Sequence, residues 1–263
     1  MESLFDGYTS RRSPRRAGAA PWDEMFPSDA PSGGEGVRLP YQDMYPALAA
    51  MDDAELRART DALASSYLAQ GVTFDFAGEE RPFPLDVVPR VVAADDWRYV
   101  ESGVKQRVRA LEAFLADVYG PQLAVQDGVI PASLISSSAH FHRQAAGIVG
   151  ANGVRIHVAG IDVIRDELGA WRVLEDNVRV PSGVSYVLAN RRVMAQTLPE
   201  LFTSLRVRPV VDYPSRLLQA LRAAAPDGVD DPTVVVLTPG VHNSAYYEPV
   251  SYTHLRAHET RGN

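Results

Sequence analysis

Residues 162–183 read DVIRDELGAWRVLEDNVRVPSG and predict a β-hairpin. Two runs rich in β-branched residues flank a polar turn, which is the pattern of two strands joined by a short loop. With a four-residue loop at residues 167–170, Asp162 lies directly opposite Glu175, and their Cβ atoms are about 5 Å apart on the same face. Asn177 shares that face because side chains alternate along a strand. The hairpin is therefore expected to bring two carboxylates and an amide together.

This combination of side chains indicates a site for a divalent cation. Two carboxylates at this separation repel each other unless a cation lies between them. Carboxylate and amide oxygens suit Mg²⁺, which keeps further positions for water and phosphate. The alternative is a surface hairpin with charges near its turn, and a five-residue loop would place Asp162 and Glu175 on opposite faces. The register with the four-residue loop thus makes candidate metal ligands of Asp162, Glu175 and Asn177, and the register with the five-residue loop does not.

Helical and strand patterns alternate along the rest of the chain, which predicts a mixed α/β fold with a helical N-terminal part. Apolar residues at helical spacing extend from Trp97 to Tyr119, and the following glycine and proline end that pattern. The apolar run at residues 233–237 is predicted to be a buried strand that starts a Rossmann-like sheet. Further helices are expected at residues 52–68, 186–202 and 214–225, and further strands at residues 74–76, 81–85 and 154–164.

Composition restricts the class of protein and its partners. The chain has 263 residues, a net charge of −7 and no cysteine, which excludes a disulfide scaffold, a thiol nucleophile and a cysteine-based metal site. No apolar run is long enough to span a bilayer, and the chain does not open with the apolar h-region of a signal peptide. We therefore expect no secretory signal and a cytoplasmic protein without membrane partners. An acidic chain without a basic stripe is also not expected to bind nucleic acid.

The two ends of the chain differ from its middle. Residues 1–36 combine an arginine cluster with a segment rich in glycine, proline and serine, and we expect them to be disordered. Residues 251–260 read SYTHLRAHET, which resembles the translation of a sequencing adapter. We therefore expect residues 37–248 to be a partial domain that is truncated near Glu248, and residues 249–263 to be a non-native tail.

Four segments carry more specific motifs. They are LEDNVRVPSGVSY at residues 174–186, GVKQR at residues 103–107, HVAGID at residues 157–162 and GVHNSAYYE at residues 240–248. Together they resemble the circularly permuted ATP-grasp family, type 2, over residues 45–248. The resemblance implies an ATP-dependent ligase with an incomplete ATP-grasp fold. In that family a carboxylate attacks the γ-phosphate of ATP, and an amine or another nucleophile captures the acyl phosphate.

The resemblance also implies Mg²⁺ and ATP as cofactors and assigns roles to individual residues. The metal ligands would be Asp162, Glu175 and Asn177. Arg179 would be catalytic, by neutralising a phosphate or the acyl phosphate. Backbone N–H groups at Ser182 and Gly183 would bind the nucleotide if these residues open a helix, and Asn243 and Ser244 would bind the acceptor substrate. The implied partners are a small-molecule or peptide carboxylate and a nucleophile.

Two features depart from the family pattern. Related amide ligases carry an arginine two residues before the first metal-binding aspartate, where this chain has Gly160. Lys105 is the single lysine among 26 basic residues, although the family holds the nucleotide with lysines and a glycine-rich lid that follow the metal-binding segment. The chain is thus expected to be inactive by itself. The alternatives are a non-catalytic scaffold that keeps the fold and a metal-dependent hydrolase that uses the same carboxylates.

Overall fold

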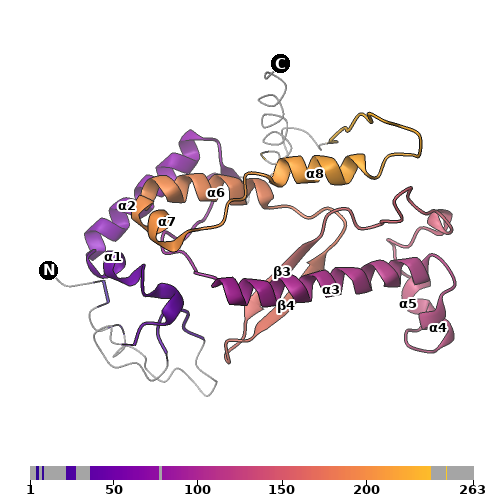
Figure 1. Cartoon of the computed structure of the whole chain (residues 1–263), viewed down its shortest axis with the longest axis horizontal. Coiled ribbons are helices and arrows are strands. Elements are labelled where there is room, and N and C mark those ends of the chain that lie inside the picture. Colours follow the sequence, from indigo (N-terminus) through magenta and orange to yellow (C-terminus); the bar gives the residue numbers. More distant parts are fainter. Residues whose placement is uncertain are drawn as a thin grey trace.

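The computed structural model describes residues 4, 5, 8, 22–27, 36–76, 79–237 and 247, and its elements are drawn in Figure 1. The helices are α1 (Tyr45–Ala49), α2 (Asp53–Ala69), α3 (Ala94–Val118), α4 (Leu123–Gln126), α5 (Ala132–Ser136), α6 (Val184–Thr197), α7 (Pro199–Leu205) and α8 (Tyr213–Arg222). The strands are β1 (Thr73–Phe76), β2 (Glu79–Pro82), β3 (Gly160–Arg165) and β4 (Trp171–Asn177). They form two separate antiparallel pairs, β1 with β2 and β3 with β4. The predicted mixed α/β fold is confirmed.

The hydrophobic core lies where α2 packs against α6, and α7 packs on α6 beside it. The helix α2 begins directly after Asp52, whose carboxylate accepts a hydrogen bond from the backbone N–H of Glu55 at 2.9 Å and caps the helix. Tyr67 of α2 is fully buried and donates its hydroxyl hydrogen bond to Asn190 of α6 at 2.6 Å. Burial raises the pKa of Tyr67 to about 12. This buried contact ties α2 to the helix that follows the β3–β4 hairpin.

Residues 22–27 lie within the segment that we expected to be disordered, and two of their side chains lie in the core. Met25 and Phe26 are buried in the core. Trp22 packs on the turn between β3 and β4, so closely that a Cβ atom on Gly169 would lie 2.6 Å from the indole ring. The physical reason is the apolar surface of these side chains, whose burial outweighs the ordering entropy of a short segment.

The helix α3 crosses the β3–β4 hairpin (Figure 1) and is fixed at two points to the hairpin and at a third to the segment before it. Near its start, Asp96 pairs with Arg165 of β3 at 2.5 Å. In its middle, Arg107 pairs with Asp176 of β4 at 2.6 Å. Near its end, the Glu112 carboxylate accepts hydrogen bonds at 2.7 and 2.9 Å from the two backbone N–H groups at residues 155–156. One face of the hairpin is therefore covered by α3.

Three expected elements differ from the structure. The helix expected at residues 186–202 is broken into α6 and α7, because Pro199 has no N–H and forces Leu198 out of the helical conformation. Residues 154–159 are not a strand, and β3 begins at Gly160. The expected strand at residues 233–237 is irregular and exposed, with Leu237 91% exposed.

The missing strand at residues 233–237 has a simple physical cause. A strand needs a neighbour for its ladder hydrogen bonds, and no strand of the described residues pairs with it. The predicted start of a Rossmann-like sheet is therefore not formed by the residues that the structure describes. Among the described residues, no helix combines the length and the apolar character needed to cross a membrane.

Candidate functional site

The register of the β3–β4 hairpin places Asp162 directly opposite Glu175. The predicted four-residue loop is wrong, because Arg165 pairs with Trp171 and five residues connect them. A β-bulge between Asp162 and Val163 compensates, since Val163 pairs with Val173 and Leu174 is left without a partner. The bulge adds one residue to β4, so the side chains beyond it return to the faces that the shorter loop would have given them.

The longer loop is stabilised by its first residue. The carboxylate of Asp166 accepts hydrogen bonds from the backbone N–H groups of Leu168 at 3.0 Å and Ala170 at 2.8 Å. Gly169 completes the turn with a φ of +78°, which a residue with a Cβ atom rarely adopts. The side chain of Arg172 also contacts Asp166, at 2.8 Å, and this contact lowers the pKa of Asp166. An aspartate in the first loop position therefore favours the five-residue turn.

The three candidate metal ligands meet on the face of the hairpin that α3 leaves open. The amide nitrogen of Asn177 donates to Glu175 Oε1 at 2.8 Å and to Asp162 Oδ2 at 3.4 Å. All three residues are exposed to solvent. The amide bridges the two carboxylates and offsets part of their mutual repulsion. The structure thus brings together the residues that the hairpin argument selected.

The side chain between two of these ligands points the other way. Asp176 lies between Glu175 and Asn177 in β4 and faces α3, where Arg107 binds both of its oxygens at 2.6 Å. The hydrogen bonds from Arg107 lower the pKa of the Asp176 carboxyl. Neither Asp176 nor Arg107 was predicted from the sequence. Strand alternation was the available signal, since it turns Asp176 away from its neighbours and requires a partner on the covered face.

The donor set suits a hard cation. Two carboxylate oxygens and one amide oxygen are ligands that Mg²⁺ accepts, with the remaining positions left to water or phosphate. The amide of Asn177 can present its oxygen instead of its nitrogen by rotating about its terminal bond. No group of three or more His, Cys, Asp or Glu side chains in the described part of the chain could hold a metal. The amide is therefore an essential part of this candidate site.

The loop after β4 folds back over the start of β3. Pro181 packs so closely on Gly160 that a Cβ atom on this glycine would lie 2.8 Å from the proline ring. This packing explains the departure at position 160, because an arginine side chain there would collide with the loop. Gly183 forms the N-cap of α6 with a φ of 114°, and Ser182 and Arg179 are exposed. Arg179 makes no hydrogen bond or ion pair with the residues that the structure describes.

The proposed acceptor residues Asn243 and Ser244 lie outside the described residues, as does the tail at residues 249–263. Lys105 lies on α3, and its ammonium group contacts Glu101 at 2.6 Å. The single lysine is therefore engaged in an exposed ion pair within its own helix.

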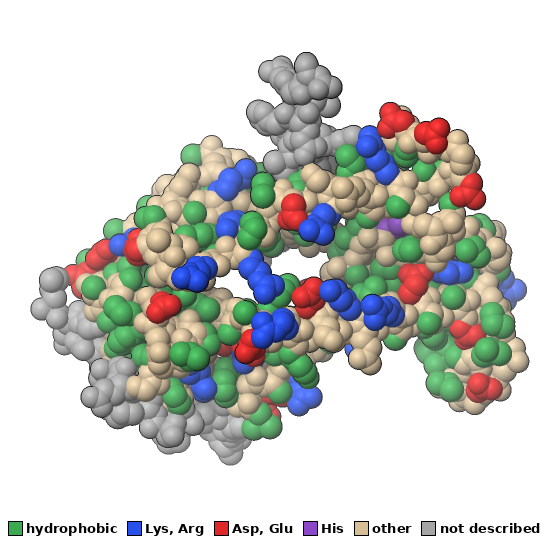
Figure 2. Space-filling view, viewed as in Figure 1, with side chains coloured by type: hydrophobic (Ala, Val, Ile, Leu, Met, Phe, Trp, Pro, Cys, Tyr) green, Lys and Arg blue, Asp and Glu red, His purple; other side chains and the backbone are tan. Residues whose placement is uncertain are grey.

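Figure 2 shows basic side chains around an opening in the face of the molecule that it draws, with acidic side chains between them.

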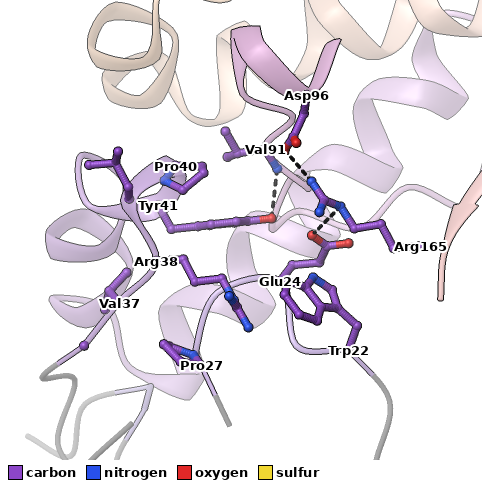
Figure 3. Close-up of a pocket in the computed structure, with 12 residues that line it drawn as sticks. Trp22, Glu24, Pro27, Val37, Arg38, Pro40, Tyr41, Val91, Asp96 and Arg165 are labelled. Atoms are coloured by element: carbon purple, nitrogen blue, oxygen red, sulfur yellow. Dashed lines mark hydrogen bonds and ion pairs between the residues drawn. The ribbon is translucent and has the colours of Figure 1, made fainter. Parts of the chain in front are cut away.

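A pocket of about 430 Å³ lies on the covered side of the hairpin, next to residues 22–27 (Figure 3). Arg165 pairs there with Glu24 at 3.4 Å and with Asp96 at 2.5 Å. Arg38 stacks on the Trp22 ring, 3.8 Å from the ring centroid. The two arginines and two carboxylates among its lining residues balance in formal charge. We therefore assign these contacts to holding residues 22–27 against the hairpin.

Comparison with known proteins identifies relatives of this chain. A family model described as "a circularly permuted ATPgrasp" matches residues 89–256. An uncharacterized protein of Mycobacterium tuberculosis (strain ATCC 25618 / H37Rv) is 56% identical over 247 residues, which are 94% of this chain and 43% of that protein. An uncharacterized protein of Synechocystis sp. is 50% identical over 182 residues, 68% of this chain and 38% of that protein. The chain thus spans less than half the length of these relatives.

A further relative has a name that states an activity. A protein of Frankia casuarinae named "putative glutamate--cysteine ligase 2-2" is 41% identical over 215 residues. The match covers 81% of this chain and 25% of that protein.

Proposed function

This chain belongs to the circularly permuted ATP-grasp family, and we propose that it supplies the metal-binding part of an ATP-dependent ligase. The observation that carries the proposal is the convergence of Asp162, Glu175 and Asn177 on one open face of the hairpin. Two exposed carboxylates placed opposite each other have an electrostatic cost that a bound cation removes. Family membership supplies the reaction class, and this geometry supports the position of the metal.

In the proposed reaction, a carboxylate oxygen attacks the γ-phosphorus of ATP and ADP leaves. The resulting acyl phosphate then loses phosphate when an amine or another nucleophile attacks its carbonyl carbon. Mg²⁺ held by Asp162, Glu175 and Asn177 would neutralise phosphate oxygens during the first step. The carboxylate is a small molecule or a peptide end, and the name of the Frankia relative favours glutamate with cysteine as the nucleophile.

The loop that follows β4 provides the other proposed contacts. Arg179 is exposed and can pair with a phosphate or with the acyl phosphate, since a guanidinium donates two parallel hydrogen bonds to such groups. Ser182 and Gly183 precede the 14-residue helix α6, and the positive end of its dipole attracts a phosphate. The contact between Pro181 and Gly160 keeps this loop next to the strand that carries Asp162. Asn243 and Ser244 remain proposed acceptor-binding residues.

We propose that the chain by itself binds the metal without turning over ATP. A lysine is the usual point charge for nucleotide phosphates, and the single lysine of this chain is paired with Glu101 on α3. No second lysine is available to take its place.

The reaction is tested with the full-length relative from Mycobacterium tuberculosis, using glutamate and cysteine as the first probes. The products of ATP are identified by phosphorus NMR in the presence and absence of Mg²⁺. We expect ADP and phosphate, formed only when Mg²⁺ and the carboxylate are both present. Formation of AMP and pyrophosphate would contradict an acyl-phosphate mechanism. Metal-dependent cleavage of a peptide bond without ATP would favour the hydrolase alternative.

A further inference from the structure

We infer that Arg107 is a positioning residue for the metal site. Its contact with Asp176 selects the strand register in which Glu175 and Asn177 both face Asp162. The inference rests on the proposed function, because it concerns the same metal ligands. It adds a residue on α3 that does not touch the metal and yet determines whether the ligands converge.

The contact between Arg107 and Asp176 is bidentate. Arg107 donates from Nε to one oxygen of Asp176 and from Nη2 to the other, both at 2.6 Å. Two parallel hydrogen bonds fix orientation as well as distance. The Asp176 side chain is 20% exposed and the Arg107 side chain 44% exposed. The Arg107–Asp176 ion pair therefore lies at the edge of the helix–hairpin contact and holds one residue of β4 on the covered face.

Beyond Val173, the β4 strand can pair with β3 in two registers, one with the bulge and one without it. In the observed register, Leu174 is unpaired and Asp162 faces Glu175. Without the bulge, the pairing that starts at Arg165 and Trp171 would continue regularly and place Leu174 opposite Asp162. Every later side chain of β4 would then move to the other face. Glu175 and Asn177 would point toward α3, and the metal ligands would be separated.

Little else in β4 selects the bulged register. Leu174 is 65% exposed and gains little from either position. Asp176 changes faces between the registers, and it reaches Arg107 as observed only when the bulge is present. The helix that carries Arg107 is itself held at Asp96 and Glu112. Arg107 therefore acts from a fixed support, and its loss removes a contact that favours the ligand-forming register.

If Arg107 acted only through its positive charge, removing it would have the opposite effect on metal affinity. Arg107 is a cation near a proposed cation site, so its removal would lower the repulsion felt by a bound metal and strengthen metal binding. Loss of positioning weakens binding instead, and changes in groups that orient metal ligands typically cost about 10- to 100-fold in metal affinity. The direction of the change in metal affinity therefore separates the two roles.

The test is Mn²⁺ binding to the full chain, followed by the loss of the free Mn²⁺ signal in electron paramagnetic resonance. We expect Arg107→Ala to weaken Mn²⁺ binding by about tenfold or more. Arg107→Lys keeps the charge but not the two parallel hydrogen bonds, so it should restore only part of the affinity. Arg216→Ala is the matched control, because Arg216 forms an exposed ion pair with Asp212 near α8, and it should bind as the wild type does. Near-UV circular dichroism reports whether each variant is folded.

The outcomes distinguish the two proposals. Mn²⁺ binding by Arg107→Ala that equals or exceeds wild-type binding, while Glu175→Gln abolishes it, would overturn the positioning role and keep the metal site. Wild-type affinity in Glu175→Gln, or no binding by the wild type, would overturn the metal site and the inference with it. If Arg107→Ala does not fold, Arg107→Lys decides, since undiminished affinity in that variant contradicts the need for a bidentate contact.

Discussion

Asp162 and Glu175 lie directly opposite each other, although five residues connect Arg165 to Trp171 at the turn between their strands. A loop of that length would separate them in a regular hairpin, and the unpaired Leu174 restores their pairing. The candidate metal site thus depends on an irregularity in β4 and on the contacts that maintain it.

The contact between Arg107 and Asp176 predicts the pH dependence of the Asp176 carboxyl. Arg107 lowers the pKa of Asp176 in the folded chain, below the value of about 3.9 for an unperturbed aspartate. The stabilisation is therefore complete above about pH 4 and is lost as the pH falls through the lowered pKa. Carbon-detected NMR of the side-chain carboxyl should show this low pKa in the wild type. In Arg107→Ala the pKa should rise toward the unperturbed value, and an unchanged pKa would mean that the contact does not form in solution.

The backbone conformations of Gly183 and Gly103 differ, so alanine substitutions at the two positions should change the free energy of unfolding in opposite directions. Gly183 has a φ of 114° at the N-cap of α6, so Gly183→Ala should lower the free energy of unfolding by about 1–2 kcal/mol. Gly103 lies within α3, and a Cβ atom there would meet no atom within 4 Å. Gly103→Ala should therefore raise the free energy of unfolding, by about 0.5–1 kcal/mol. Urea unfolding measures both, and a neutral Gly183→Ala would argue against a fixed loop before α6.

The burial of Phe26 predicts that the N-terminal segment contributes to stability. Phe26 is 2% exposed and belongs to the main core, so Phe26→Ala should cost about 3–5 kcal/mol. Leu39→Ala is the control, since Leu39 is 78% exposed and should change stability by less than about 0.5 kcal/mol. Equal melting temperatures for the two variants would show that residues 22–27 do not pack as described.

The scarcity of lysine predicts weak nucleotide binding by this chain. Each missing charge-assisted hydrogen bond costs about 1.5–3 kcal/mol, so two missing contacts weaken ATP binding roughly a hundredfold or more. Titration calorimetry with Mg-ATP should give a dissociation constant of about 100 μM or weaker. Lys105→Ala should leave this value unchanged, because Lys105 is paired with Glu101. A dissociation constant in the low micromolar range would mean that the nucleotide site is complete here.

Local sequence patterns predicted much of this structure, and the errors have physical causes. The extent of α3 and the hairpin followed from apolar spacing and strand alternation, because both are local properties of the chain. The bulge at Leu174 could not be predicted in this way, since it depends on the turn around Asp166 and on Arg107, which is far away in the sequence. The burial of Met25 and Phe26 was not predicted, because the expectation rested on the average composition of residues 1–36, which two strongly apolar side chains change little.

The central claim is that Asp162, Glu175 and Asn177 bind one divalent cation, and anomalous X-ray diffraction from crystals soaked in Mn²⁺ tests it most directly. We expect a single strong anomalous peak on the open face of the hairpin, about 2.1 Å from a carboxylate oxygen of both Asp162 and Glu175. Glu167→Gln, which removes a neighbouring exposed carboxylate in the turn, should keep this peak, and Glu175→Gln should lose it. A peak at another position, for example between Glu24 and Asp96, or a peak that persists in Glu175→Gln, would contradict the claim.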